Sequence, residues 1–280
     1  MVLRTVSELR QWSRQARRQP GSVVGLVPTM GALHAGHASL IRAAAASCSH
    51  IAVSIFVNPT QFGPNEDYAL YPRTFEADCQ LAQAAGASVV FAPSVDELYP
   101  AGAATFVEVE GLSQRLDGNS RPGHFRGVAT VVAKLLMAAE PDRAFFGQKD
   151  AAQVSVLRRM VADLRLSAEL VVCPIVREAD GLALSSRNRY LSPGERAEAL
   201  VLSRSVGQVE ARFAGGERSA AALLEAAGEI FAAQPEVRVD YIELVDWATL
   251  LPVERAANGN LFAVAAYVGT TRLIDNAILG

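Results

Sequence analysis

Apolar runs alternate with helix-like segments along the first 175 residues, and this alternation constrains the fold more than any other feature. The apolar runs are mostly continuous, as is typical of strands that are covered on both faces. A strand, a helix and a further strand, repeated in this order, predict a parallel sheet with right-handed crossovers. We expect strands at Val23–Val27, Ile51–Val57, Val89–Ala92, Ala144–Gly147 and Leu170–Val176, and helices at His37–Ala46, Thr74–Ala85, Gly127–Ala139 and Asp150–Leu164.

The pattern changes near residue 176. Ser192, Pro193 and Glu195 form a strong helix start, with serine as the N-cap and proline at the first helical position. Two helices are expected, to about Phe213 and over Ser219–Ala233, and then strands near Val239–Val245, Leu261–Tyr267 and Arg272–Ile274. The sequence therefore predicts an α/β protein: a Rossmann-like parallel sheet with helices on both faces over residues 1–175, and a smaller α+β domain over residues 176–280.

Composition narrows the class of protein. Half of the 280 residues are hydrophobic, a fifth are charged, and the net charge is −3, which excludes a disordered chain. The mild acidity and the lack of basic clusters argue against nucleic acid as a partner. No apolar run is long enough to span a membrane, and the N-terminal segment lacks the apolar core of a signal peptide. Three widely spaced cysteines fit a reducing compartment. We therefore expect a cytoplasmic protein.

The turn after the first of these strands carries the strongest sign of a ligand. It reads Met30-Gly31-Ala32-Leu33-His34-Ala35-Gly36-His37 and leads into a helix that we expect to begin near His37. Unpaired N–H groups at a helix N-terminus favour anions, and the two glycines let the backbone approach a ligand closely. His34 and His37 are three residues apart, so both imidazoles can donate to the same phosphate group. A metal half-site and a purely structural pair are the alternatives, although no cluster at ligand spacing follows.

Polar side chains after later strands fit a nucleoside triphosphate. Because the carboxyl ends of parallel strands meet at one edge of a sheet, we expect these segments to lie near the two histidines. Lys149 supplies a mobile point charge and Arg187 a planar fork of donors. Ser185 and Ser186 add hydroxyl donors. Neither a P-loop nor a G-x-G-x-x-G fingerprint is present, which argues against a P-loop kinase and a dinucleotide dehydrogenase.

Three amides and one acid complete the candidates. Gln61 and Gln153 are neutral and can both donate and accept, which suits a small substrate with hydroxyl and carboxylate groups. Asn58 either contacts that substrate or holds the turn before Pro59. Asp150 either accepts from a ribose hydroxyl or caps the following helix.

Residues 116–128 form a further polar segment that is rich in glycine and charge. Arg121, His124 and Arg126 lie in it and could all face an anion. The segment is either a surface loop or a lid on the substrate side.

Taken together, these motifs resemble the pantoate–β-alanine ligase family, within the superfamily of HIGH-motif nucleotidyltransferases and class I aminoacyl-tRNA synthetases. The H-x-G-H sequence alone indicates only the superfamily. Ala35 and Gln148 stand where some members carry glutamate. The family-specific motifs occur in family order over the N-terminal two thirds of the chain: Pro28–His34, Asn58–Phe62, Arg121–Gly127, Phe146–Asp150 and Leu184–Asn188.

The resemblance implies a two-step ligation that uses ATP. The carboxylate of pantoate attacks the α-phosphate and releases pyrophosphate, and the amine of β-alanine then attacks the acyl carbon of the pantoyl adenylate and releases AMP. His34, His37, Lys149 and Arg187 are the expected catalytic residues, and Gln61, Gln153 and Asn58 the expected contacts of pantoate and β-alanine. The resemblance places ATP against Met30, Gly31, Ala32, Leu33, His34, Ala35, Gly36, His37, Gly147, Gln148, Lys149, Asp150, Val176, Leu184, Ser185, Ser186 and Arg187.

The resemblance also implies Mg²⁺ bound through the nucleotide rather than a protein cage, a C-terminal domain that serves as a lid, and a homodimer. Two other functions remain as alternatives. A nucleotidyltransferase acting on a phosphorylated metabolite would share the fold and the H-x-G-H turn. A catalytically silent nucleotide-binding module would share the fold but has no need of His34, His37, Lys149 and Arg187 together.

Overall fold

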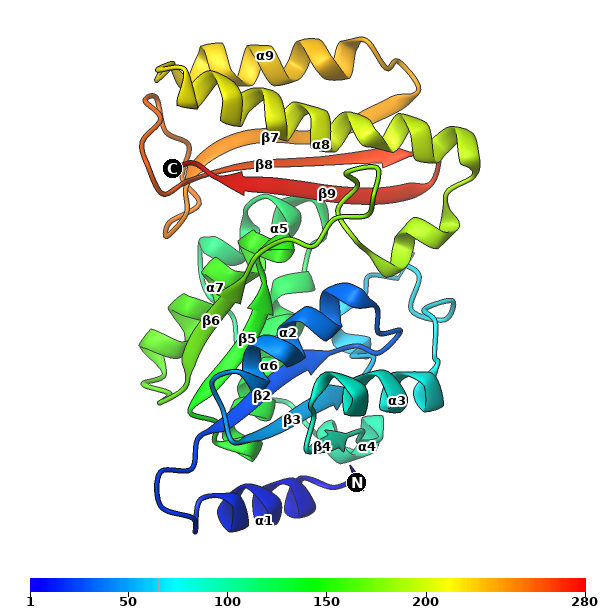
Figure 1. The fold of residues 1–280 in the computed structure, drawn as a ribbon, viewed down its shortest axis with the longest axis vertical. Helices are drawn as coiled ribbons and strands as arrows, with labels where there is room; N and C mark the ends of the chain where they lie inside the picture. Colours follow the sequence, from blue (N-terminus) through cyan, green and yellow to red (C-terminus); the bar gives the residue numbers. More distant parts are fainter. Residues whose placement is uncertain (65) are drawn as a thin grey trace. The chain divides into compact units, whose positions relative to one another are not determined.

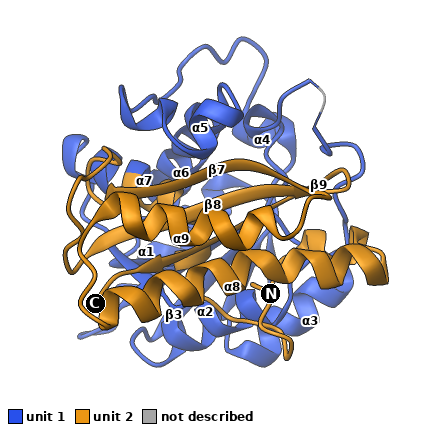
Figure 2. Cartoon of the chain, turned by 90° about the horizontal axis from the view of Figure 1, so that it is seen from above, with its two compact units in different colours: residues 1–147, 156–174 blue, residues 148–155, 175–280 orange. Residues whose placement is uncertain are grey.

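The computed structural model describes residues 1–64 and 66–280. Their contacts divide them into two compact units, coloured separately in Figure 2. The first unit comprises Met1–Gly147 and Val156–Pro174, and the second comprises Gln148–Ser155 and Ile175–Gly280. Residues 148–155 thus belong to the second unit although they lie within residues 1–175 of the chain. The sequence did not predict this assignment.

The first unit is built on a six-stranded parallel sheet in the order β1-β4-β3-β2-β5-β6 (Figure 1). The predicted doubly covered parallel sheet is confirmed. The short edge strand β1 is additional, and its two residues gave no pattern from which to predict it. The strands are β1 Val2–Leu3, β2 Val24–Thr29, β3 His50–Ile55, β4 Val89–Phe91, β5 Arg143–Gly147 and β6 Glu169–Cys173.

Helices cover both faces of this sheet. α2 packs against β2 and against α3, whereas α6 packs against β2 and against α1, so α2 and α3 lie on one face and α1 and α6 on the other. The helices of this part of the chain are α1 Val6–Ala16, α2 Ala35–Ala45, α3 Phe75–Ala85, α4 Val95–Leu98, α5 Asp117–Ser120, α6 His124–Ala139 and α7 Ala151–Asp163, with short 3₁₀ turns at Pro59–Gln61, Leu112–Gln114 and Gln148–Asp150.

Several predicted boundaries are wrong by a few residues, for identifiable reasons. β6 ends at Cys173 rather than at Val176, since Pro174 has no N–H to donate to a neighbouring strand. β2 instead continues through Pro28 to Thr29, because it pairs with β3 as far as Ile55. α6 begins at His124, about one turn before the predicted start at Gly127.

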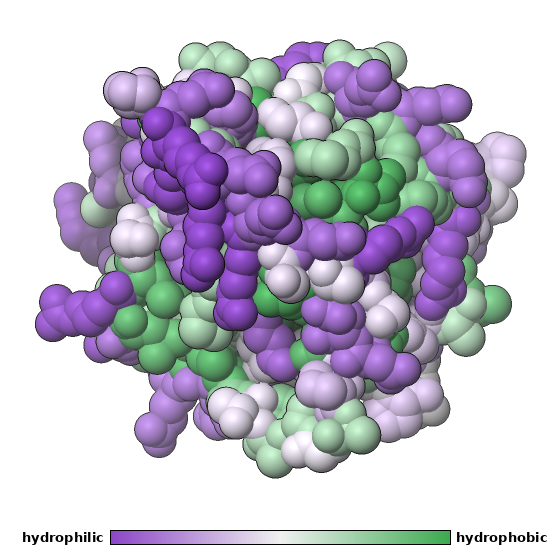
Figure 3. All heavy atoms as spheres, turned by 90° about the horizontal axis from the view of Figure 1, so that it is seen from below, coloured by the Kyte–Doolittle hydropathy of each residue, from purple (hydrophilic) through white to green (hydrophobic). Residues whose placement is uncertain are grey.

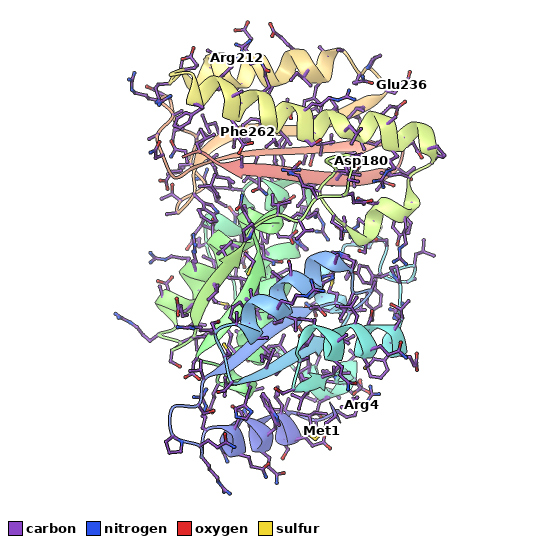
Figure 4. All side chains as sticks on the ribbon, viewed as in Figure 1. Met1, Arg4, Asp180, Arg212, Glu236 and Phe262 are labelled. Atoms are coloured by element: carbon purple, nitrogen blue, oxygen red, sulfur yellow. The ribbon has the colours of Figure 1, made fainter. Side chains whose placement is uncertain are left out.

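The second unit is a three-stranded antiparallel sheet with two helices. Ser192 caps α8 through a capping box with Glu195, as the sequence predicts. Phe262 of β8, labelled in Figure 4, is fully buried in a core that includes Leu202 of α8 and Leu223 of α9. The elements are α8 Pro193–Ala214, α9 Ala220–Ala232, β7 Val237–Asp246, β8 Asn260–Val268 and β9 Thr271–Ile278, preceded by a 3₁₀ helix at Ser186–Tyr190.

Among the described residues, no helix is both long enough and apolar enough to cross a bilayer. On the face shown in Figure 3, hydrophobic groups occur in several areas that are separated by hydrophilic side chains.

Candidate functional site

A buried carboxylate shapes the turn that follows β2. Asp78 of α3 is 2% exposed and accepts hydrogen bonds from the N–H groups of Ala32 (2.9 Å) and Leu33 (2.7 Å). Gly31 has a φ of +87°, and a Cβ there would lie 3.1 Å from the Asp78 carboxylate, so the turn requires glycine. The sequence reasoning missed Asp78. Its signal was an acidic residue on the same helix face as the buried Ala82 and Ala85.

The two histidines form a capping box. His34 is the N-cap of α2, and its Nδ1 accepts from the N–H of Gly36 at 3.2 Å. The Nδ1 of His37 accepts from the N–H of His34 at 3.3 Å, and the ring centroids are 4.1 Å apart. Since one nitrogen of a neutral imidazole accepts and the other carries the proton, both rings hold their proton on Nε2. α2 therefore begins at Ala35, two residues before the predicted start, and His37 lies within its first turn.

Asn58 and Gln61 form a buried amide pair in the turn after β3. Asn58 is 1% exposed, and its Nδ2 donates to Gln61 Oε1 and to the carbonyl of Gly127, both at 3.1 Å. Its Oδ1 accepts from the hydroxyls of Thr60 and Tyr99, both at 2.9 Å. Both polar atoms of Asn58 are thus bonded within the protein, which favours the interpretation that it holds the turn. Gln61 Nε2 lies 2.9 Å from Met30 Sδ, which places Gln61 beside the H-x-G-H turn.

The segment over residues 116–128 is not a plain surface loop. It contains α5 and the first turn of α6, and Asp117, Gly118 and Phe125 are buried. Arg121 forms a two-pronged ion pair with Glu66, at 2.9 and 2.5 Å, and the guanidinium of Arg126 stacks 3.9 Å above the ring of Phe106. Both arginines that were predicted to face an anion therefore contact other side chains of the protein.

In the second unit, a buried asparagine of β9 holds the segment that contains Lys149. Asn276 is 3% exposed, and its Nδ2 donates to the carbonyls of Gln148 (3.0 Å) and Lys149 (2.9 Å). Lys149 Nζ lies 3.9 Å from Asp150 Oδ1, and Asp150 is exposed. Gln153 is half-buried in the first turn of α7. Sequence reasoning missed Asn276, whose signal was a polar pair with Asp275 inside an apolar strand.

The remaining predicted residues lie in a hairpin of the second unit. The N–H of Leu184 donates to the carbonyl of Val176 at 2.9 Å. Ser185 then caps the 3₁₀ helix, its Oγ accepting from the N–H of Arg187 at 3.3 Å. The buried Asn188 donates to Glu178 Oε1 (2.6 Å) and thereby ties the two arms of the hairpin together. The predicted site residues thus form two groups, one organised within each unit.

Known proteins resemble this chain over its full length. The family model described as Pantoate-beta-alanine ligase matches residues 1–278. A pantothenate synthetase from Acidobacterium capsulatum is 60% identical over 99% of this chain and 96% of its own. A crystal structure of pantothenate synthetase from Thermus thermophilus is 47% identical, with a TM-score of 0.92 and coverage of 99% and 98%. A Francisella tularensis pantoate-beta-alanine ligase complexed with Beta-gamma ATP and Beta-alanine is 32% identical, with a TM-score of 0.80 and coverage of 99% and 97%.

Proposed function

The chain belongs to the pantoate–β-alanine ligase family, and we propose here which of its residues perform the family's reaction. The protein condenses (R)-pantoate with β-alanine to pantothenate at the expense of ATP, in the biosynthesis of pantothenate and coenzyme A. A pantoate carboxylate oxygen forms a bond to the α-phosphorus as pyrophosphate leaves. The amine of β-alanine then attacks the acyl carbon, loses a proton and displaces AMP. Similarity over the full length excludes the nucleotidyltransferase and the silent module as alternatives.

The observation that carries the residue assignment is the histidine capping box. With both Nδ1 atoms accepting from backbone N–H groups, His34 and His37 each have an Nε2–H with which to donate to phosphate oxygens. Protonating either ring would put a second proton on Nδ1 and oppose a backbone N–H. We therefore assign both residues as neutral donors that stabilise charge on the phosphates in the transition state. Met30–His37 would form the ATP contact of the first unit.

Lys149 and Arg187 would contact the triphosphate from the second unit. The lysine suits oxygens that shift during the reaction, and the planar fork of the arginine suits a fixed pair of oxygens. Ser185 and Ser186 add donors, although the Oγ of Ser185 also caps the 3₁₀ helix in this structure. The ATP contact would extend over Gly147, Gln148, Asp150, Val176 and Leu184, and the C-terminal domain would act as a lid.

Gln61 and Gln153 would hold pantoate. Asn58 fixes the Oε1 of Gln61, so the Nε2 of Gln61 is directed away from Asn58. One N–H of this nitrogen donates to Met30 Sδ, and the other can donate to a hydroxyl or carboxylate oxygen. Gln153 is half-buried and retains exposed surface for a second contact. Asn58 itself would act through Gln61 and not on the substrate.

Mg²⁺ would enter with the nucleotide. Among residues 1–64 and 66–280, no group of three or more His, Cys, Asp or Glu side chains is arranged to hold a metal ion. An ion that entered with ATP would be held by phosphate oxygens and water and would neutralise charge on the β- and γ-phosphates.

We also propose a cytoplasmic homodimer. β6 is an edge strand of the six-stranded sheet, and a surface hollow of about 520 Å³ beside it is lined by Arg158, Val161, Ala162, Arg165, Leu166 and Leu170. An edge strand beside apolar side chains favours pairing with a second copy. Sedimentation should give twice the 29.8 kDa of one chain, and a charge introduced by Leu170→Glu should shift the protein toward the monomer.

Isotope exchange tests the assigned reaction. With pantoate and ATP alone, labelled pyrophosphate should enter ATP, because the adenylate forms before β-alanine arrives. Lys149→Ala should slow this exchange more than it weakens ATP binding, since its charge acts mainly in the transition state. An exchange that requires β-alanine, or ADP as the product, would contradict the two-step scheme. A normal exchange rate in Lys149→Ala would remove that residue from the site.

A further inference from the structure

Three side chains behind Gln61 form a chain of hydrogen bonds that the proposed function leaves unused. The carboxylate of Glu66 binds the guanidinium of Arg121 through two bonds, at 2.9 and 2.5 Å. Arg121 Nη1 lies 3.0 Å from Nε2 of His124. His124 Nδ1 lies 2.9 Å from the backbone carbonyl oxygen of Gln61, and Arg121 Nη2 also donates to that oxygen at 3.4 Å. The chain therefore ends on the backbone of a predicted substrate contact.

The chemistry of Arg121 decides which nitrogen of His124 carries the proton. A guanidinium only donates, so Nε2 of His124 must accept. The proton of the neutral ring is then on Nδ1, which donates to the carbonyl oxygen of Gln61. Burial and the adjacent Arg121 charge lower the pKa of His124 to about 4, which keeps the ring in this form at neutral pH.

The turn that carries Gln61 is also held from α6. A Cβ added to Gly127 would lie 2.3 Å from the carbonyl oxygen of Thr60 and 2.6 Å from Cα of Gln61, so the helix backbone packs directly against the turn. Asn58 bridges the same two elements through its bonds to Gln61 Oε1 and the Gly127 carbonyl. The backbone and the carboxamide of Gln61 are thus both fixed from the protein interior.

We propose that Arg121 and His124 are positioning residues that hold Gln61 in the orientation required to bind pantoate. This inference rests on the proposed contact between Gln61 and pantoate. Because Glu66 already binds the Arg121 fork, the arginine serves this chain of hydrogen bonds and not the carboxylate of β-alanine. A misplacement of about 1 Å in a substrate contact is enough to cost roughly 10²-fold in rate.

The test uses pyrophosphate exchange with pantoate and without β-alanine. His124→Ala should lower kcat/KM for pantoate in this exchange by roughly 10- to 100-fold, with little change in KM for ATP. His124→Asn, which keeps a donor at the δ position, should recover most of the loss. Arg121→Lys keeps the charge but loses the fork, and should resemble His124→Ala. This variant also provides the test if His124→Ala fails to fold.

Three outcomes separate the inference from its alternatives. Normal exchange with a raised KM for β-alanine would overturn it and make Arg121 and His124 contacts of that substrate. Exchange impaired in Gln61→Ala but normal in His124→Ala and Arg121→Lys would overturn it while leaving the proposed function intact. Normal exchange in Gln61→Ala would instead refute the pantoate contact. The control is Arg143→Gln, which breaks the exposed ion pair with Glu169. Arg143 is the first residue of β5, at the end of the strand opposite to the Lys149 segment, and this variant should leave exchange unchanged.

Discussion

The turn after β2 and the segment after β5 follow neighbouring strands of one sheet, yet they are held in different ways. In the first, the imidazoles of His34 and His37 bond to N–H groups two and three residues away. In the second, the carbonyls of Gln148 and Lys149 are held by Asn276, which lies more than 120 residues later in the chain. Local capping therefore orients the histidines, whereas the lysine segment depends on the packing of a remote strand.

The largest effect should come from separating the two functions of His37. His37→Asn keeps an acceptor for the N–H of His34 but lacks the Nε2–H donor. We expect adenylate formation, measured by rapid quench, to fall by roughly 10²–10³ while the unfolding temperature stays unchanged. His37→Ala removes the acceptor as well and should lose about 0.5–1 kcal/mol of stability in addition.

The comparison of these two variants is itself the control. Equal stability of the Asn and Ala variants would show that the capping bond contributes nothing. Full activity of His37→Asn would show that the histidine is only a cap, and the assignment of Nε2 as a phosphate donor would fail.

A smaller effect should follow from releasing the Lys149 segment. Asn276→Ala removes both bonds to the carbonyls of Gln148 and Lys149, and we expect kcat/KM for ATP to fall on the order of 30-fold. The matched control is Asn260→Ala in the neighbouring strand β8, where the side chain accepts from Ala257 instead. It should lose similar stability without losing activity. Equal kinetic losses in the two variants would mean that Asn276 acts only through the stability of the second unit.

The smallest effect should appear in the pH dependence of unfolding. His124 has a folded pKa of about 4 against 6.5 as its ordinary value, so the unfolded chain binds more protons between these values. Stability should therefore fall as the pH drops from 6.5 to 4, because the unfolded chain takes up the proton first. The groups that face the ring are Arg121, Glu66 and Asp117.

The second unit should respond at lower pH. The Arg196 hydrogen bond lowers the pKa of Glu178 below 4.5, so that carboxylate contributes stability above pH 4.5 and loses it only on further acidification. Urea unfolding of the protein and of His124→Gln at pH 7.0, 5.5 and 4.5 tests the loss of stability assigned to His124. This range lies above the pH at which Glu178 loses its contribution. The variant should lack the loss above pH 4.5, and identical profiles would contradict the assignment.

The parts of the site that could be predicted are those whose partners are close in sequence. The apolar runs predicted the parallel sheet, and the serine, proline and glutamate at the start of α8 predicted its cap. The H-x-G-H turn located the histidines, but the capping role of the first one shifted the helix start by two residues. Single-residue boundaries depend on which side chain caps the helix, which composition does not specify.

The partners of the site could not be predicted, because each comes from another part of the chain. Asp78 lies 45 residues or more beyond the N–H groups that it binds, and Glu66 lies 55 residues before Arg121. No local pattern pairs such residues. The sequence predicted that Arg121 and Arg126 could face an anion. The glutamate and the aromatic ring that contact them come close only in the folded chain.

The contact between α6 and the Gln61 turn bears on any attempt to engineer the enzyme for other acids. Position 127 has no room even for a methyl group, so a saturation library there should return glycine alone. Gly207 of α8 has no atom within 4 Å of an added Cβ and should accept alanine. Space for a bulkier acid therefore cannot be gained by moving the turn back toward α6. On the proposed contact between Gln61 and pantoate, that space has to come from changes to other residues of the substrate site, with α6 left intact.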